Sequence, residues 1–250
     1  MKIIAGMHRS GTSIVTRLLF EAGADLGDPD TFYRPDKWNP DGYFEQPEFH
    51  AINRPLINGP FGRLSYFRVP STETLNRRAR RFADEIKAVS DKYRGKVVKE
   101  VRFCLTMPGW QQQGARFDRV LVCLREPYEV VRSVDRRFPV GHRRAYRLWR
   151  IHNERLLAHA KDLPLWFISF SHLRNPETRT REIRTALEFM EVPCSDEKLE
   201  YLVSLIKSPK HEADARAREE YAPEIATLWE DLQARHDAQF APEKAAHVHG

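Results

Sequence analysis

The first 23 residues join a short apolar run to an amphipathic helical pattern through a glycine-flanked loop. The apolar run covers 2–5, the loop covers 6–13, and apolar residues recur at helical spacing from Ile14 onward. Gly6 and Gly11 permit a tight turn and a close approach of the backbone to a ligand. A strand that enters a helix in this way presents backbone N–H groups and a helix N-terminus to a phosphate. The N-terminus therefore predicts an α/β fold with an anion site.

The cation of this loop is displaced from its usual place. The loop fits the spacing GxxxxG[KT][ST], but Thr12 stands where a nucleotide triphosphatase carries its lysine, and Arg9 supplies the cation instead. This arrangement favours a site in which a phosphate is bound or acts as a leaving group, rather than a site that transfers a γ-phosphate. An ordinary strand-to-helix turn shares the glycine spacing, but not the ordered set of strand, arginine and paired hydroxyls. The expected phosphate-binding residues are His8, Arg9, Ser10, Gly11, Thr12 and Ser13.

Further strands and helices alternate along the chain. Strands are predicted at about 2–6, 96–101, 119–124 and 165–170, and helices at about 11–23, 72–92, 127–136, 145–160, 177–190, 196–206 and 223–238. The helix at 145–160 is expected to place five residues on its inner face: Leu148, Trp149, Ile151, His152 and Leu156. This alternation predicts a single P-loop-type domain over 1–250, of the α/β class, with a central parallel sheet flanked by helices.

Two segments are expected to cover this domain. Residues 25–63 hold six of the sixteen prolines among interleaved aromatics, which disfavours long helices and strands, although 48–57 fits a short helix. We expect this segment to cover the ligand edge of the sheet. Residues from about 200 to 250 form a second covering segment, on the acceptor side.

Composition narrows the classes of partner. The net charge of +6 and pI near 9.3 suit an anionic ligand, yet no nucleic-acid-binding motif accompanies them. No apolar run is long enough to span a bilayer, and the short N-terminal run is unlike a signal peptide, so a cytoplasmic protein is expected. Cys104 and Cys123 are expected as buried thiols, and no metal site is expected, including at His247 and His249. The oligomeric state is left open.

A second anion motif follows the strand at 119–124. Arg125 ends that strand and Ser133 lies two helical turns further on. Ligands of open parallel sheets bind beyond the carboxyl ends of the strands, so both side chains can converge on one anion beside the first loop. Alternatively, Arg125 pairs with Glu126 or Glu129, and Ser133 bonds within its own helix.

Together, the two motifs resemble sulfotransferases that use 3′-phosphoadenosine 5′-phosphosulfate (PAPS). In that family, a loop like 8–13 holds the 5′-phosphosulfate, and an Arg…Ser pair at the spacing of Arg125 and Ser133 holds the 3′-phosphate. Three further segments resemble the bacterial branch: NPDGYFE at 39–45, KEVR at 99–102 in place of KDPR, and FISFSHL at 167–173. The resemblance covers most of residues 1–190.

The resemblance implies transfer of a sulfuryl group from PAPS to a hydroxyl or amine, with release of adenosine 3′,5′-bisphosphate. It implies that Arg9 stabilises the leaving phosphate, that Lys99 is a second cation, and that no metal is required. Glu45 is the candidate general base and Glu100 the reserve, while His50 and His142 are weaker candidates. The chain departs from the family at His8, where proline is common, and at Glu100 and Val101.

Other functions remain open from the sequence. A small-molecule kinase that uses ATP and magnesium is one alternative, and a catalytically silent nucleotide-binding protein is another. For a sulfotransferase, a small-molecule, glycan or lipid acceptor is expected, and the sequence does not identify it. Four aromatic residues fit either an acceptor-stacking role or a core role: Trp38, Tyr43, Phe44 and Trp110.

Overall fold

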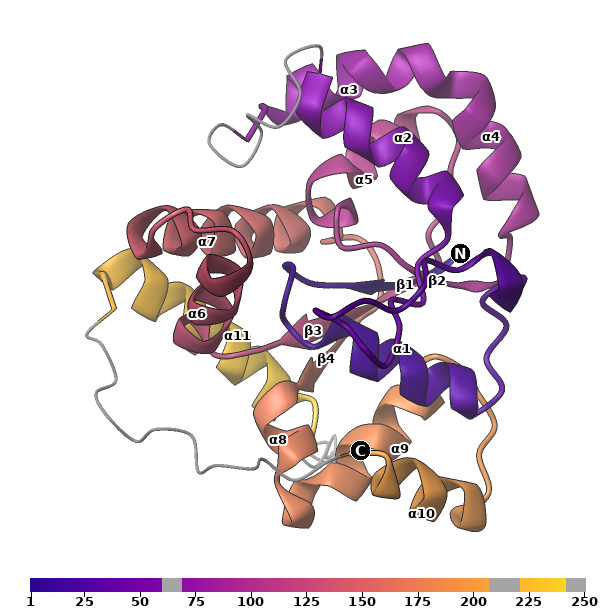
Figure 1. Ribbon diagram of the computed structural model, residues 1–250, viewed down its shortest axis with the longest axis vertical. Helices are drawn as coiled ribbons and strands as arrows, with labels where there is room; N and C mark the ends of the chain where they lie inside the picture. The colour runs from indigo at the N-terminus through magenta and orange to yellow at the C-terminus, as the bar shows by residue number, and fades with distance from the viewer. Residues whose placement is uncertain (60–68, 207–220, 242–250) are drawn as a thin grey trace, which may run out of the picture.

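The structure, a computed structural model, describes residues 1–59, 69–206 and 221–241. A central parallel sheet flanked by helices organises these residues, which confirms the predicted α/β class (Figure 1). Parts of the two predicted covering segments lie outside the described residues: 60–63 of the first, and 207–220 and 242–250 of the second, with His247 and His249.

Four strands form the sheet in the order β2-β1-β3-β4. They are β1 (Lys2–Ala5), β2 (Val97–Lys99), β3 (Arg119–Leu124) and β4 (Leu165–Ser169). All pairings are parallel, so the carboxyl ends of the strands meet at one edge. The chain crosses from β1 to β2 on one side and returns to β3 on the other. This change of direction places a crevice at the end of β1, where α/β proteins commonly bind ligands.

Helices occupy both sides of this sheet. Before β3 they are α1 (Thr12–Glu21), α2 (Pro47–Asn58), α3 (Thr72–Ala79), α4 (Ala83–Lys92) and α5 (Phe103–Gln112), with 3-10 turns η1 (Pro29–Thr31) and η3 (Arg80–Phe82). After β3 they are α6 (Pro127–Arg137), α7 (His142–His159), α8 (Phe170–Arg174), α9 (Pro176–Phe189), α10 (Asp196–Ser204) and α11 (Pro223–Ala238). Among the described residues, none of these helices has both the length and the apolar character that crossing a membrane demands.

Side-chain alternation along the strands creates two apolar cores. Ile3 and Ala5 face a core shared with α2–α7 and α11, whereas Ile4 faces a core shared with α1, α9 and α10. Figure 1 shows these two helical layers on opposite faces of the sheet. The continuous apolar sequence of β3 follows from this arrangement, because its side chains are buried on both faces.

Several elements differ from the sequence prediction. Strand β2, expected over about 96–101, covers only Val97–Lys99. The expected helix over 72–92 is interrupted by η3, and its inner side is fully buried through Leu75, Ala79 and Ile86. Helix α5 was not predicted, because it contains Pro108. Strand β4 ends at Ser169, and the short helix α8 begins at once.

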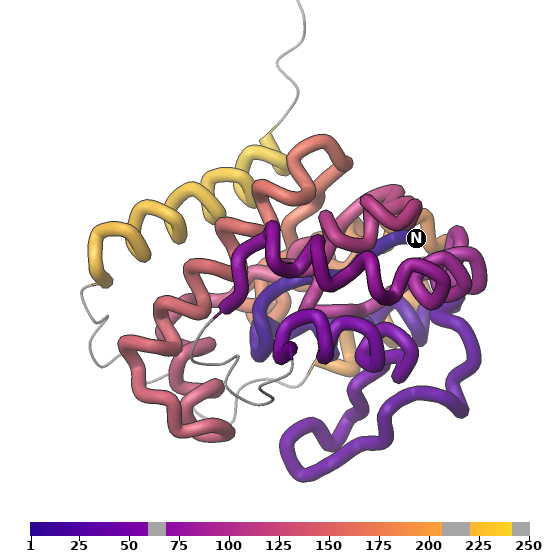
Figure 2. Tube along the Cα trace, turned by 90° about the horizontal axis from the view of Figure 1, so that it is seen from above, coloured from indigo at the N-terminus to yellow at the C-terminus, as the bar shows by residue number. Residues whose placement is uncertain are grey.

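The covering segments divide between loop and helix. Between α1 and α2 the chain forms only the turn η1 before it reaches the predicted short helix, and Figure 2 shows this segment extending outward and turning back. At the other end, α11 packs on β4 and α7, and Figure 2 shows it in yellow along the periphery. Helix α11 therefore covers its own domain, as its apolar spacing predicts.

Candidate functional site

The loop between β1 and α1 depends on unusual backbone angles. Gly6 and Gly11 have φ angles of +154° and +92°, and Arg9 has a φ of +74°. A Cβ atom on Gly11 would lie 2.7 Å from Cδ2 of Phe170. Only glycine satisfies both the angle and the space at this position. Gly11 is thus explained by the packing of the loop against α8, and Gly6 by its close approach to Cys123 of β3.

Helix α1 presents an open N-terminus to this loop. Its N-cap is Gly11, which makes no side-chain cap, and its first turn carries no acidic residue. The first amide N–H groups of a helix have no intrahelical partners, and the helix dipole adds positive potential there. Ser10 and Thr12 are buried beside these groups. The end of α1 is therefore suited to an anion.

The two predicted anion motifs meet in space. Arg9 donates from Nε to Oγ of Ser133 at 2.8 Å, and Arg125 donates from Nη1 to the carbonyl oxygen of Arg9 at 3.1 Å. Ser133 therefore bonds outside its own helix. Arg125 also pairs with Glu129 at 2.7 Å and lies over the ring of Phe170 at 4.3 Å. Arg125 therefore pairs with Glu129, as the alternative interpretation expects, and it also lies beside the first loop, as the anion-site interpretation expects.

Lys99 connects the end of β2 to the same loop. Its Nζ donates to Oγ of Ser13 at 2.9 Å and to the carbonyl oxygen of Tyr43 at 2.7 Å. It also pairs with Glu45 at 3.0 Å, and the side chains of Lys99 and Glu45 are 2% and 14% exposed. Asn39 donates a second hydrogen bond to Oγ of Ser13 at 3.1 Å. Because both contacts use Ser13 as acceptor, its hydroxyl proton remains available for an anion.

Each of the two candidate bases, Glu45 and Glu100, forms an ion pair with a cationic side chain. The sequence suggests Arg34 or Lys37 as an ordinary surface partner for Glu45, but its partner is the buried Lys99. Glu100 is buried and accepts from both the backbone N and Nη1 of Arg102, at 2.8 and 2.9 Å. Glu100 therefore holds the start of α5 and the Arg102 side chain in place.

The NPDGYFE segment lies over the loop. Arg9 reaches the carbonyl oxygen of Trp38 at 3.4 Å, Arg17 reaches Asp41 at 3.2 Å, and Arg137 donates to the hydroxyl of Tyr43 at 3.1 Å.

The four aromatic residues that were candidates for stacking on an acceptor differ in their surroundings. Trp110 is fully buried and donates to Asn53 at 2.8 Å, and Phe44 packs against Phe20 and Phe32. Trp38 is the most exposed of the four.

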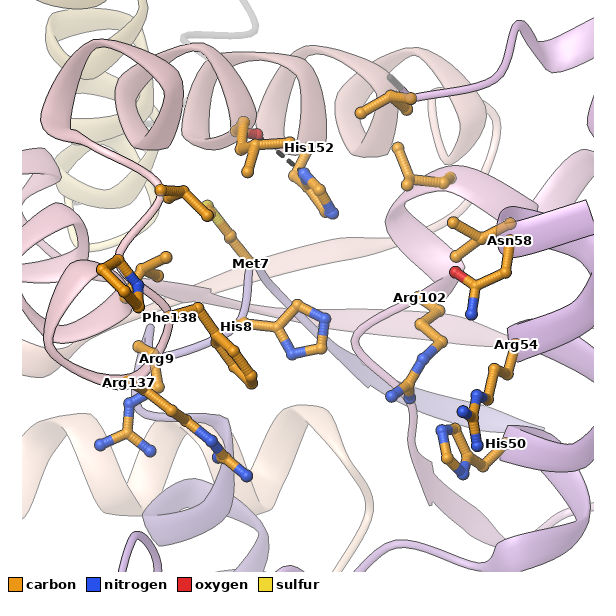
Figure 3. Close-up of a pocket in the computed structure, with 17 residues that line it drawn as sticks. Met7, His8, Arg9, His50, Arg54, Asn58, Arg102, Arg137, Phe138 and His152 are labelled. Carbon is orange, nitrogen blue, oxygen red and sulfur yellow. Dashed lines mark hydrogen bonds between the residues drawn. The ribbon is translucent and has the colours of Figure 1, made fainter. Parts of the chain in front are cut away.

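A cavity of about 550 Å³ opens beside the loop. In Figure 3, His8 projects into its middle, with Arg9, Arg137 and Phe138 on one side. On the other side stand His50 and Arg54 from α2 and Arg102 from the start of α5, while His152 points in from α7. The apolar wall is completed by Ile57, Val69, Leu105, Val134, Val140 and Leu148.

The electrostatics of this cavity keep its histidines neutral. Burial, with help from nearby Arg102, lowers the pKa of His8 well below its usual value. Burial lowers the pKa of His50 and of His152 to about 4. Burial, together with Arg137 and Arg125, also lowers the pKa of Arg9, although an arginine stays charged at neutral pH. The fixed positive charge of the site therefore comes from arginine and lysine.

Most of the site residues predicted from the sequence lie close together in the structure, but His142 does not. The loop residues 8–13, Lys99, Arg125 and Ser133 gather at the carboxyl edge of the sheet. His142 stands exposed at the start of α7, near Asp135. The sequence did not reveal Asn39, Arg54, Arg102, Arg137 or His152 as site residues. The helical periodicity of α7 did place His152 on an inward face, which was its available signal.

Comparison with protein-family models gives no match for this chain, and comparison with curated proteins gives none either. The site is therefore interpreted from its own geometry and chemistry.

Proposed function

We propose that this protein is a PAPS-dependent sulfotransferase. The observation that carries the proposal is the contact of two anion motifs that lie far apart in the sequence: Arg9 reaches Ser133 at 2.8 Å, and Arg125 reaches Arg9 at 3.1 Å. A donor with a 5′-phosphosulfate and a 3′-phosphate requires two neighbouring anion sites. The open N-terminus of α1 suits the first phosphate, and the Arg125–Ser133 pair suits the second.

The chemistry assigned to each residue follows from its position. Arg9 and the amides of α1 stabilise the charge that develops on the departing 5′-phosphate. Lys99 is aimed at Ser13 at the start of the same helix, so it adds a second positive charge beside the leaving group. Sulfuryl transfer then depends on in-line positioning of donor and acceptor, as phosphoryl transfer does.

Ligand-dependent unfolding tests the donor. Adenosine 3′,5′-bisphosphate is expected to raise the unfolding temperature, whereas ADP with magnesium and AMP have little effect. A ligand at a hundred times its Kd adds about 2.7 kcal/mol of stability. Arg125→Ala should abolish most of this shift. Arg132→Ala is the matched control, because Arg132 is an exposed arginine on α6, the helix that carries Ser133.

Each rival function has its own outcome. Stabilisation by ADP with magnesium alone would replace the proposal with a small-molecule kinase, although Thr12 occupies the lysine position of such enzymes. Stabilisation by the bisphosphate without turnover of PAPS, across a broad acceptor panel, would indicate a catalytically silent nucleotide-binding protein. Sulfated product, detected by mass spectrometry, supports the transferase.

A further inference from the structure

We propose that the cavity beside the loop is the acceptor site, that its occupant is a hydroxyl-bearing organic anion with an apolar body, and that His8 removes the hydroxyl proton. This inference rests on the proposed sulfotransferase function and specifies the substrate class and the base at the same site. The cavity holds about 550 Å³, which lies within the range of roughly 300–1,000 Å³ that is typical of small-molecule sites.

The charge of the cavity selects an anion. Among the described residues, the side chains that line it include the four arginines Arg9, Arg54, Arg102 and Arg137, and no carboxylate. Arg102 is partly neutralised by Glu100, and Arg137 has Asp36 at 3.9 Å, but Arg54 stands on the exposed side of α2 at the cavity wall. Guanidinium groups bind carboxylate and sulfate groups through paired hydrogen bonds. An acidic group on the acceptor would meet these guanidinium groups on either side of the cavity.

The apolar wall of the cavity selects an apolar body. Leu105 comes from α5, Val134 from α6 and Leu148 from α7, and Phe138 and Val140 lie between the last two helices. A molecule that fills the cavity would remove these side chains from water, which stabilises the complex in proportion to the apolar area covered. A purely polar sugar would gain little from this wall. The combination favours an amphipathic acid.

His8 is placed to act on this occupant. Its ring projects into the cavity (Figure 3). The next residue, Arg9, reaches Ser133 in the donor site. His152 commits Nδ1 to the carbonyl oxygen of Leu148 at 2.7 Å, and His50 commits Nδ1 to Tyr33 at 2.6 Å. The His8 ring lies edge to face with His152, at 6.3 Å between ring centres. Of these three histidines, His8 alone belongs to the loop that holds the donor.

The charges around His8 keep its ring unprotonated. Arg102, Lys99 and Arg137 are the cations near it, and His152 is the other titratable group. Together with burial, they lower the pKa of His8, so the ring is neutral at physiological pH. Glu45, by contrast, is paired with Lys99 and is not part of the cavity lining among the described residues. We therefore assign Glu45 to the positioning of Lys99.

These groups account for each bond that forms or breaks in the transfer step and for the proton that is released. The acceptor oxygen forms a bond to the sulfur of PAPS, while the bond from sulfur to the 5′-phosphate oxygen breaks. The electron pair of the broken bond stays on the phosphate, next to Arg9. The hydroxyl proton passes to the ring of His8 and later to solvent. The products are the sulfate ester of the acid and adenosine 3′,5′-bisphosphate.

Matched acceptor pairs test the substrate class. Hydroxylated acids, such as 4-hydroxyphenylacetate and 12-hydroxydodecanoate, are compared with their methyl esters for kcat/KM, and for stabilisation of the protein in the presence of the bisphosphate. We expect at least a tenfold preference for the acids. Arg54→Met should reduce this preference about tenfold, whereas Arg77→Met, at an exposed arginine of α3, should leave it unchanged. Equal turnover of acids and esters, or no stabilisation by any acid, would overturn the assignment.

A second experiment tests His8. His8→Ala should lower kcat by about 10²- to 10⁴-fold while the shift produced by the bisphosphate persists, and added imidazole should restore part of kcat. Glu45→Gln should keep the wild-type preference for the acids over their methyl esters. A kcat of His8→Ala within threefold of the wild type would overturn the role of His8 and return Glu45 as the base.

The two proposals fail in different ways. If the bisphosphate does not stabilise the wild-type protein, then the sulfotransferase function itself is wrong. If the bisphosphate binds and neutral acceptors are sulfated as well as acids are, then the donor assignment stands and only the acceptor class fails.

Discussion

At the residue scale, the proposed donor site depends on a glycine that no other residue can replace without strain. Gly11 has a φ of +92°, and a Cβ there would lie 2.7 Å from Phe170, whose ring also lies under Arg125. A change at Gly11 therefore disturbs both the start of α1 and the Arg125 side chain. Gly11 and Arg125 are therefore coupled through their shared neighbour Phe170.

Gly11→Ala is predicted to destabilise the protein by about 2–4 kcal/mol, from the left-handed backbone and the clash with Phe170 together. Gly114→Ala is the matched control, since Gly114 has a similar φ of +88° but nothing within 4 Å of its added Cβ. Urea denaturation measures both. The control should cost only the backbone strain of about 1–2 kcal/mol. Equal losses for the two variants would contradict the proposed role of Phe170.

Local chemistry made part of this site predictable. Residues 8–13 form a contiguous pattern, and the spacing of Arg125 and Ser133 follows from one strand end and one helix. The partner of Glu45 was not predictable, because Lys99 reaches it only once β2 is paired beside β1. The cavity was missed for the same reason, since its side chains come from α2, α5, α6 and α7, which share no sequence pattern.

At the element scale, α7 shows what periodicity predicts and what it leaves out. Leu148, Trp149, Ile151, His152 and Leu156 were expected on its inner face; Ile151 is half-buried and the other four are buried. The periodicity did not predict that His152 donates to the carbonyl oxygen of Leu148 or that it faces a cavity. Helix α5 was missed, because Pro108 and Gly109 inside it disguise a helix that tight packing against α3 supports.

The buried His152 predicts a pH dependence. Its pKa is near 6.5 in the unfolded chain and about 4 in the fold, so protons bind preferentially to the unfolded chain between these values. Stability is therefore lost as the pH falls from 6.5 towards 4, by about 2 kcal/mol between pH 7 and pH 5. His152→Gln should remove this part of the loss in urea denaturation. His142→Gln, at the exposed start of the same helix, should keep the wild-type loss; an unchanged profile in His152→Gln would contradict the assignment.

At the scale of the whole molecule, the chain protects both edges of its sheet. At the β2 edge, the backbone N of Val97 donates to the carbonyl oxygen of Asp25 at 2.9 Å. At the β4 edge, the side-chain amide of Gln239 pairs with the backbone of Phe167 in both directions, at 2.9 and 2.5 Å. The strand order and these edge contacts are long-range features, so the alternation of strands and helices could predict the sheet but not its edges.

The end of α11 is anchored beside this edge by a buried polar cluster. Nε2 of His236 lies 2.8 Å from Glu182 of α9, and the second oxygen of Glu182 accepts from the backbone N of Ser169 at 3.0 Å. Although burial opposes a charge on His236, its hydrogen bonds to Glu182 and Asp237 raise the pKa of the imidazole. A charged His236 paired with Glu182 therefore holds α11 against α9 and the end of β4.

Gln239→Ala tests whether this side chain acts as a substitute strand. The change leaves the N–H and C=O of Phe167 without their partner, and each unpaired buried group costs about 1–3 kcal/mol. We expect a loss of stability in that range in urea denaturation, with faster hydrogen exchange in β4. Because an open strand edge is a template for pairing with another chain, the variant should also associate more readily, as measured by light scattering. Gln112→Ala, at the exposed end of α5, is the control. Equal stability and equal association of the two variants would show that α11 protects the edge through its apolar packing alone.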